Sequence, residues 1–330
     1  MKLGIAGAGN IVLDLLSFVQ DVPGIRLEAI CSKPEHENKL LTLQKKHGIS
    51  RIYHSYNGML ADDDVDTVYI GLPNHLHYTY AKEALLNGKH VICEKPFTSN
   101  LEEFLELEKL AVRSGLILLE AISNQYLGSY LLMKEYLPKL GPVKIVECNY
   151  SQYSSRYDAF RAGEVLPAFD PGMSGGALMD INIYNIHFVV GCFGSPQKVQ
   201  YSANMDRGID TSGVLLLDYG GFKCVCIGAK DSTARNAVNI QGTDGYIHLS
   251  GSANSVDGFE YAANRQQPVK VNRKNHEHRM YDEFMAFEAM IQGNDRESAN
   301  RMLEHSRRVM QVVEQAKQSA GLVFGSDQSK

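Results

Sequence analysis

The chain has 330 residues, of which 44% are hydrophobic and 22% charged, and it carries a net charge of −5. This length suits two domains, and the composition is typical of a soluble globular protein rather than a disordered one. No basic excess points to a nucleic acid as partner, and no apolar run reaches membrane-spanning length. The first strand-like run begins without a signal peptide ahead of it, so we expect a cytoplasmic protein that does not bind a membrane.

The first third of the chain alternates strand-like and helical patterns. Strands separated by helices predict βαβ units, and hence a parallel sheet. The predicted strands cover residues 3–6, 27–31, 67–70, 90–93 and 116–119. The predicted helices cover residues 11–20, 37–47, 76–87 and 101–114.

The turn between the first strand and the first helix is rich in glycine. Gly7 permits a tight turn, Gly9 lets a pyrophosphate approach the backbone, and the helix opens at Asn10 and Ile11 with its amides toward the phosphate. Val12 stands where a third glycine is common, but that position serves helix–strand packing, so we expect spacing to absorb the larger residue. We predict a dinucleotide site here; the alternative is a plain strand–helix turn.

The residues about twenty positions further on distinguish NAD from NADP. NAD sites place an Asp or Glu there against the ribose hydroxyls, whereas this chain has Ser32 and Lys33 after the second predicted strand. A hydroxyl and a cation suit a 2′-phosphate, so we favour NADP(H) as cofactor. NAD(H) is the alternative, with Glu35 or Glu37 reaching back to the ribose.

Beyond about residue 122 the pattern changes to longer alternating or apolar runs separated by tight turns. These runs predict a mostly antiparallel sheet, with a helix over residues 177–193 crossing between strands and two helices, 277–292 and 298–320, closing the chain. The predicted strands cover residues 143–153, 197–204, 213–219, 222–229, 237–241 and 246–249.

The change of pattern divides the chain into two predicted domains, residues 1–121 and residues 122–330, of which residues 325–330 are expected to be a frayed tail. The six cysteines lie mostly in apolar stretches and lack the paired spacing of zinc sites, so we expect them to be reduced and expect no metal site. Cys224 and Cys226 fall in one predicted strand, where we place their side chains on opposite faces of the sheet.

Three stretches in the two predicted domains resemble the signature of one family. They are GLPNHLHYTYAKEALLNGKHVICEKP at residues 71–96, FDPGMSGGALMDINIYNIHFVVGCFGSP at residues 169–196, and GTDG at residues 242–245. The family is that of glucose–fructose oxidoreductase and inositol dehydrogenase (Gfo/Idh/MocA), and the resemblance extends over essentially the whole chain.

The resemblance implies an α/β fold with an N-terminal Rossmann domain, built on a doubly wound parallel sheet, and a C-terminal α/β domain with an open, mostly antiparallel sheet. It implies an active site between the domains and a homodimer or homotetramer formed through the C-terminal sheet. The chain looks most like the Tyr-type subgroup that includes dihydrodiol and xylose dehydrogenases. That subgroup transfers a hydride between a nicotinamide and a secondary alcohol or carbonyl of a sugar, sugar derivative or diol.

Lys95 follows the fourth predicted strand of the first domain, and ligands of parallel sheets bind beyond the carboxyl ends of strands. Its ammonium can donate a hydrogen bond to the reacting oxygen and lower the pKa of a neighbouring hydroxyl. The resemblance implies a cis bond between Lys95 and Pro96 that aims this side chain. The alternative is a surface lysine in a strand-to-loop turn.

The resemblance also places a second loop and one more side chain beside the cofactor. The loop follows the third predicted strand and contains Pro73, Asn74 and His77, and the additional side chain is that of Glu94. For His77 the alternative is a structural role, capping or bracing the helix that follows.

Asp180, Tyr184 and His187 have the spacing i, i+4 and i+7, which predicts that one helical face presents all three. The resemblance implies that Tyr184 is the acid/base, that Lys95 assists it, and that Asp180 orients a hydroxyl. It also suggests His187 as a substrate contact, and we expect Asn182 to narrow the approach to the nicotinamide ring. The alternative is a helix that packs polar residues against the core.

Residues 153–176 are predicted to form a long loop, in which Arg156, Tyr157 and Arg161 are candidate substrate contacts. The alternative is a surface excursion or an oligomer contact. Together these features predict an NADP(H)-preferring oxidoreductase. Two other functions remain open on the same scaffold: redox-assisted glycosidic cleavage with tightly held NAD, and nucleotide sensing without catalysis.

Overall fold

The computed structural model describes residues 1–327, which form two units. Unit 1 consists of Met1–Ala121 and Met280–Ser306, and unit 2 consists of Ile122–Arg279 and the chain from Arg307 onward. The chain therefore divides after Ala121, where the sequence pattern changes. Met280–Ser306, however, groups with unit 1 rather than with the rest of residues 122–330.

Unit 1 is built on a six-stranded parallel sheet of order β3-β2-β1-β4-β5-β6. The order reverses between β1 and β4, which is the arrangement of a doubly wound Rossmann sheet. Every residue of β4 is buried, as expected for a strand covered on both faces. The strands are β1 Lys2–Ala6, β2 Arg26–Cys31, β3 Arg51–Tyr53, β4 Thr67–Ile70, β5 His90–Glu94 and β6 Leu118–Ala121.

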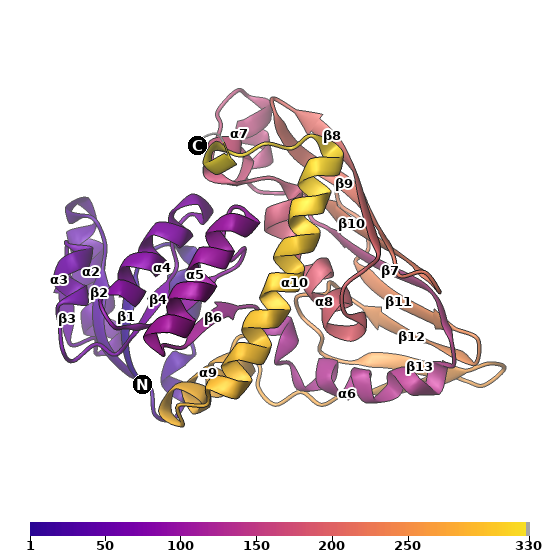
Figure 1. The fold of residues 1–330 in the computed structure, drawn as a ribbon, viewed down its shortest axis with the longest axis horizontal. Coiled ribbons are helices and arrows are strands. Elements are labelled where there is room, and N and C mark those ends of the chain that lie inside the picture. Colours follow the sequence, from indigo (N-terminus) through magenta and orange to yellow (C-terminus); the bar gives the residue numbers. More distant parts are fainter. Residues whose placement is uncertain (328–330) are drawn as a thin grey trace. The chain divides into compact units, whose positions relative to one another are not determined.

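Helices separate these strands, and α4 and α5 pack side by side (Figure 1). The start of α5 is fixed by Asn100, whose side chain accepts a hydrogen bond from the Glu103 amide, and its end is fixed by Gly115 in the left-handed conformation. The helices of unit 1 are α1 Asn10–Leu16, α2 Glu37–His47, α3 Tyr56–Leu60, α4 His77–Leu86, α5 Leu101–Ser114 and α9 Tyr281–Gln292. Helix α10, Arg296–Ala320, begins in unit 1 and ends in unit 2.

Unit 2 contains an eight-stranded sheet of order β14-β13-β12-β11-β7-β10-β9-β8. Strands β7 and β10 run parallel, and the other neighbouring pairs run antiparallel, which confirms a mostly antiparallel sheet. The strands are β7 Val143–Ser151, β8 Lys198–Asp206, β9 Ile209–Asp218, β10 Lys223–Ala229, β11 Ala237–Gly242, β12 Gly245–Ser250, β13 Phe259–Ala263 and β14 Val269–Val271. The helices are α6 Gly128–Tyr136, α7 Tyr157–Arg161 and α8 Ile183–Phe193.

The two faces of this sheet differ in burial. Strand register and the alternation of side chains place a set of exposed apolar residues on one face, which we call the open face: Ile145, Val214, Leu216 and Tyr246. Helix α8 packs against the opposite face of β7 and β10 (Figure 1).

Cys224 and Cys226 both lie on the buried face of β10, with their Sγ atoms 3.7 Å apart. The expectation that they point to opposite faces is wrong, because side chains alternate with a period of two and residues i and i+2 share a face. Burial raises the pKa of the neighbouring Cys148 thiol well above its ordinary value. The six cysteines are free thiols in this structure.

Several elements differ from the sequence prediction. Strands β3, β13 and β14 and helices α3, α6 and α7 are absent from it, and β6 begins two residues later than expected. One segment, Pro171–Phe193, is apolar and long enough to cross a membrane, contrary to the expectation, but 78% of its most apolar window is buried inside the protein. Of the predicted frayed tail, Gly325–Asp327 forms a helical turn in which Asp327 pairs with Lys317, and residues 328–330 lie outside the described residues.

Candidate functional site

The first turn of unit 1 has the geometry of a nucleotide-binding loop. Gly7 has φ +118° and donates its amide to the Cys31 carbonyl at 2.8 Å, and a Cβ added to it would lie 2.5 Å from the Gly71 carbonyl oxygen. Only glycine fits there. A Cβ added to Gly9 would meet no atom within 4 Å, so the backbone ahead of α1 borders open space, as close approach of a pyrophosphate requires.

Val12 is fully buried, although it occupies the position of a third glycine. A Cβ added to Gly71 would lie 2.8 Å from Val12 Cγ2 and 3.2 Å from Ile11 Cγ2. The missing glycine on α1 is therefore compensated by a glycine at the end of β4. Helix α1 begins at the exposed Asn10, one residue before the predicted start, and ends at Leu16, four residues before the predicted end.

Ser32 and Lys33 lie after the carboxyl end of β2, and two histidines that the sequence analysis missed surround them. Ser32 Oγ is 2.7 Å from His36 Nδ1, and His54 Nδ1 is 3.3 Å from the Ser32 carbonyl oxygen. The Lys33 side chain is 76% exposed and lies 3.8 Å from a Glu35 oxygen. Hydroxyl, ammonium and imidazole groups together suit a phosphate dianion.

The loop after β4 is tied to the loop after β5 by His77. This side chain is fully buried, with Nδ1 2.8 Å from the Pro96 carbonyl and Nε2 2.9 Å from the Leu72 carbonyl. Burial lowers the pKa of His77, although both carbonyls oppose that shift. This geometry gives His77 the bracing role that the sequence left as an alternative, while Pro73 and Asn74 lie nearer the surface at the start of the turn.

Lys95 follows β5 directly, and its bond to Pro96 is cis, as the family resemblance implied. The Glu94 carboxylate is buried and accepts a hydrogen bond from Tyr69 Oη at 2.8 Å. The Lys95 side chain is partly exposed, at the end of the sheet where parallel-sheet proteins bind ligands.

In unit 2 the predicted helix over residues 177–193 begins as a π-helix, Leu178–Asn182, and continues as α8. A π-turn holds more residues than an α-turn, so Asp180 and Tyr184 do not follow the regular i, i+4 spacing. The Asp180 side chain is 38% exposed, Tyr184 is 8% exposed and His187 is fully buried. His187 is therefore out of reach of surface solvent, and the shared helical face stays a prediction.

The π-helix is held by contacts to β9 and β10. Asp210 Oδ2 accepts hydrogen bonds from the Leu178 amide at 2.6 Å and from Tyr201 Oη at 2.7 Å. Asn182 is fully buried and donates to the Cys226 carbonyl, so it packs against the sheet and does not narrow the approach to a nicotinamide ring as we expected.

Tyr184 is supported on two sides within unit 2. Its ring centroid is 6.0 Å from that of Tyr150 on β7, and its carbonyl accepts a hydrogen bond from Asn124 Nδ2 at 3.0 Å. The Tyr150 hydroxyl lies 3.4 Å from Asn254 Nδ2 and 3.3 Å from Gln152 Oε1. Several polar groups that can bind hydroxyls therefore lie on the side of Tyr184 that faces Tyr150.

Asp180 forms an ion pair with Lys230, a buried residue that the sequence analysis did not single out. Lys230 Nζ is 2.9 Å from Asp180 Oδ2, and the Lys230 side chain is 1% exposed. No motif marks Lys230, which is the residue after β10 and lies 50 positions from Asp180. The Gly175-Gly176 pair before the helix is the one sequence signal that could have suggested close packing of another segment against this part of the chain.

The loop over residues 153–176 contains α7 and is ordered by aromatic contacts. Tyr157 lies 5.6 Å from Phe169 between ring centroids, and Phe160 stacks on Phe169 at 4.8 Å. The Arg207 guanidinium covers the Phe160 ring at 3.6 Å. Tyr157 is thus part of this cluster, whereas Arg156 is exposed just before α7.

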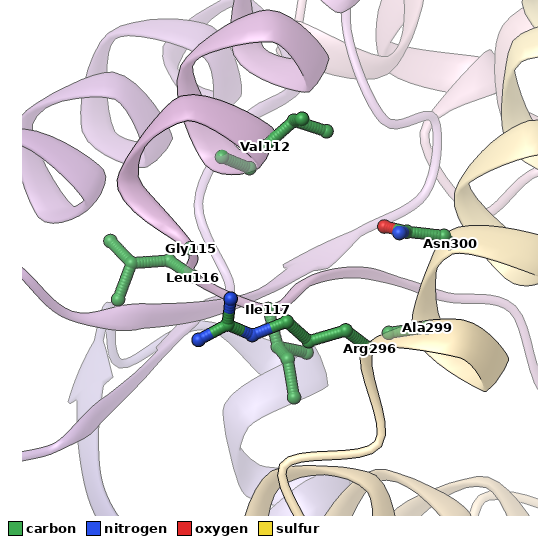
Figure 2. A pocket seen from close by; sticks show the side chains of 8 residues that line it. Val112, Gly115, Leu116, Ile117, Arg296, Ala299 and Asn300 are labelled. Atoms are coloured by element: carbon green, nitrogen blue, oxygen red, sulfur yellow. The ribbon is translucent and has the colours of Figure 1, made fainter.

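A cavity of about 210 Å³ lies in unit 1. The end of α5 and the start of α10 border it (Figure 2). It lies at the amino end of β6, because Ile117 directly precedes that strand. The candidate cofactor residues follow the carboxyl ends of β1, β2, β4 and β5, so we do not assign this cavity to the cofactor. Within residues 1–327, no group of three or more His, Cys, Asp or Glu side chains could hold a metal ion.

Two family models match the chain. The model described as "Oxidoreductase family, NAD-binding Rossmann fold" matches residues 1–121, and the model "GFO/IDH/MocA C-terminal domain" matches residues 137–248. The two matches together cover more than half of the chain.

Two curated relatives match nearly the whole chain. A scyllo-inositol 2-dehydrogenase (NADP(+)), IolU, of Bacillus subtilis (strain 168) is 33% identical over 332 residues, which cover 100% of both chains. A trans-1,2-dihydrobenzene-1,2-diol dehydrogenase of Xenopus tropicalis is 25% identical, and the match covers 98% of this chain and 99% of that one.

A solved structure has the same fold. KijD10, a 3-ketoreductase from Actinomadura kijaniata in complex with NADP and TDP-benzene, superposes with a TM-score of 0.83 at 20% identity. The superposition covers 96% of this chain and 97% of that one. At this identity the likeness supports the fold alone.

Proposed function

Because this chain belongs to the GFO/IDH/MocA oxidoreductase family, we propose that it interconverts a secondary alcohol and a carbonyl on a sugar, polyol or related diol with NADP(H) as cofactor. One observation carries the proposal: a chain with a glycine turn open to a pyrophosphate also carries Lys95, Asp180 and Tyr184, the groups that proton transfer needs. We also propose that the enzyme acts in the cytoplasm.

The residues of unit 1 fit the cofactor. The open space at Gly9 and the amides at the start of α1 would receive the pyrophosphate, and Ser32 and Lys33, with His36 beside them, would hold the 2′-phosphate. The NADP named for the Bacillus subtilis relative agrees with this choice. NADP(H) supplies or accepts the hydride of the reaction.

Around the nicotinamide end we propose contacts from Pro73, Asn74, Glu94 and Lys95. These residues follow β4 and β5, whose carboxyl ends border the ligand side of the sheet. His77 then acts on the cofactor indirectly, because its two ring nitrogens hold the loops that carry those residues.

We propose that Tyr184 donates a proton to the substrate oxygen during reduction and accepts it during oxidation. Lys95 assists by favouring the phenolate, and the Asp180 carboxylate accepts a hydrogen bond that orients the reacting hydroxyl. Arg156 and Tyr157 would contact the remainder of the substrate. His187, being buried, would support the helix near Tyr184 rather than bind substrate from the surface.

The surroundings of Tyr184 favour a polyhydroxylated substrate over an aromatic diol. The Tyr150 hydroxyl, the Asn254 amide and the Gln152 amide can each exchange hydrogen bonds with substrate hydroxyls. A site that hydrogen-bonds substrate hydroxyls rejects analogues that lack them. A cyclic polyol such as scyllo-inositol, the substrate in the name of the most extensive match reported above, is therefore our first candidate.

The test is steady-state kinetics with scyllo-inositol, D-xylose and a trans-dihydrodiol, followed by nicotinamide absorbance. We expect turnover with NADP⁺, and a loss of roughly 100- to 10,000-fold in kcat for Tyr184→Phe, because a positioned acid/base contributes about that much. Lys95→Met should lose activity similarly. The control is Tyr136→Phe on α6, which should leave kcat unchanged because the Tyr136 ring packs against Phe259 and Tyr261. Turnover within a few-fold of wild type in Tyr184→Phe would refute the role of Tyr184.

We propose a homodimer or homotetramer formed through the open face of unit 2. Exposed apolar side chains gathered on a sheet face are typical of an interface. In this chain they are Val214, Leu216, Ile145 and Tyr246, of which Ile145 is 47% exposed and Leu216 is 43% exposed.

A further inference from the structure

Lys230 is a fully buried cation with three kinds of partner. Its Nζ is 2.9 Å from Asp180 Oδ2, 2.5 Å from the Ala168 carbonyl oxygen, and 4.4 Å from the centroid of the Phe169 ring. An ammonium has three hydrogen-bond donors and is attracted to aromatic faces, so these partners match its chemistry. They come from the π-helix and from the loop over residues 153–176.

Burying an ammonium is costly unless opposite charge and hydrogen bonds compensate for the lost water. Methionine or leucine would fill the same space without the free-energy cost of burying a charge, so filling space does not explain a lysine at this position. Here the cation is buried and its carboxylate partner is 38% exposed. The Asp180 carboxylate is therefore accessible to solvent, while the buried Lys230 ammonium sets its orientation.

Two backbone hydrogen bonds fix the position from which the Lys230 side chain extends. The Lys230 amide donates to the Thr211 carbonyl at 2.8 Å, and the Lys230 carbonyl accepts from the Ser154 amide at 2.8 Å. Ser154 is near the start of the loop, and Ala168 and Phe169 are in its second half. Lys230 thus contacts both halves of the loop and the Asp180 carboxylate.

We propose that Lys230 is a positioning residue. It holds the Asp180 carboxylate in the orientation that the reaction needs, and it couples that orientation to the conformation of the loop over residues 153–176. The inference rests on the proposed function, because Asp180 is the group proposed to orient the reacting hydroxyl. A small displacement of such a group can cost about 100-fold in rate, so the effect of losing Lys230 should be measurable.

The test is Lys230→Met in the full-length protein, with two readouts. Hydrogen exchange followed by mass spectrometry should show faster exchange of amides in residues 166–176 and unchanged exchange in unit 1. Steady-state kinetics should show kcat lowered by roughly 10- to 100-fold with the KM for NADP(H) unchanged. A substitution that merely loosened the protein would not spare the cofactor KM and the exchange of unit 1.

The matched control is Lys223→Met, at the other end of β10. Lys223 forms an ion pair with Asp218 at 2.8 Å, but its side chain is 58% exposed, so its loss should change neither readout. If Lys230→Met does not fold, Lys230→Arg replaces it. Arg keeps the charge but not the shape of the ammonium, so we expect an intermediate loss of kcat with the same pattern of exchange.

A double-mutant cycle with Asp180→Asn separates this inference from the proposed function. We expect Lys230→Met to add less than a threefold loss of kcat in the Asp180→Asn background, because the two residues act together. Full additivity, or wild-type exchange of residues 166–176, overturns the inference while leaving the function intact. If Asp180→Asn itself leaves kcat unchanged, the proposed role of Asp180 fails, and this inference fails with it.

Discussion

Asp210 is a buried carboxylate that anchors the start of the π-helix. Burial raises its pKa to about 6, while hydrogen bonds from Tyr201 and the Leu178 amide and the charge of Lys230 act in the opposite direction. A Cβ on Gly176 would lie 2.0 Å from Asp210 Oδ1. The segment that carries Asp180 therefore begins at an acid that is closely packed and changes charge in a physiological pH range.

The sign of the Asp210 contribution to stability follows from its raised pKa. Between about pH 4 and pH 6 the folded state binds more protons than the unfolded state, so the free energy of unfolding falls as pH rises through that window. A shift from 3.8 to about 6 corresponds to about 3 kcal/mol. We expect Asp210→Asn to remove this dependence. The free energy of unfolding of the variant, relative to wild type, should therefore rise by up to about 3 kcal/mol between pH 4 and pH 7.

Urea denaturation at a series of pH values measures this difference. Asp218→Asn is the control with the opposite sign. Hydrogen bonds from Lys223 and from the Gly220 amide lower the pKa of Asp218, so its small contribution to the free energy of unfolding is lost as pH falls. A difference between Asp210→Asn and wild type that does not change with pH would contradict the account of Asp210.

Among single residues, those in local motifs could be predicted and those in tertiary clusters could not. Gly7 and Gly9 are recognisable because a strand, a turn and a helix follow one another in sequence. Lys230 and Asp210 carry no local signal, since their partners lie 50 and 32 positions away in the chain. The burial of His187 was also beyond reach, because spacing alone does not show which side of a helix is covered.

At the scale of elements, the π-helix is the feature with the clearest cause. The sequence predicts a helix over residues 177–193, but an inserted π-turn depends on groups outside the helix, here Asp210 and the β10 backbone. The long helices α2 and α5 begin and end where predicted, because periodicity and a following glycine mark them. The three-residue strands β3 and β14 are too short to show a pattern.

The turn before the π-helix requires glycine for two reasons, and they can be separated by substitution. Gly176 has φ +95° and a Cβ added to it would overlap Asp210 Oδ1, whereas Gly208 has φ +80° with no atom within 4 Å of an added Cβ. Gly208→Ala should cost about 1 kcal/mol for backbone strain alone. Gly176→Ala should cost roughly 2 to 4 kcal/mol, because the steric overlap is added.

Chemical denaturation followed by circular dichroism compares these two variants at one pH. If Gly176→Ala destabilises the protein no more than Gly208→Ala, the contact with Asp210 is not what requires glycine at this position.

At the scale of the whole molecule, the alternation of strands and helices in unit 1 and the succession of strands in unit 2 could be predicted, apart from the short elements, because alternation with a period of two and helical periodicity are local signals. The assignment of Met280–Ser306 to unit 1 could not, because it depends on packing between segments far apart in the sequence. The association of copies of the chain depends on exposed side chains, and we expect it to occur through the open face of unit 2.

Light scattering coupled to size-exclusion chromatography tests the association. We expect a dimer or tetramer for wild type and a smaller species for Leu216→Asp, because a charge on the open face would be buried in the interface. The control is Val112→Asp on α5, where the exposed side chain belongs to unit 1. A monomeric wild-type protein at micromolar concentration, or a Leu216→Asp variant of unchanged mass, would contradict the proposed interface.

The central claim is that the glycine turn and the Ser32–Lys33 segment bind NADP(H), because every proposed catalytic role depends on that cofactor. Calorimetric titration of the protein with NADPH and NADH, side by side, tests it most directly. We expect tighter binding of NADPH, and loss of that preference in the double variant Ser32→Ala/Lys33→Ala, with little change for NADH. Binding of neither dinucleotide would contradict the account, and tighter binding of NADH would contradict the assignment of the 2′-phosphate site.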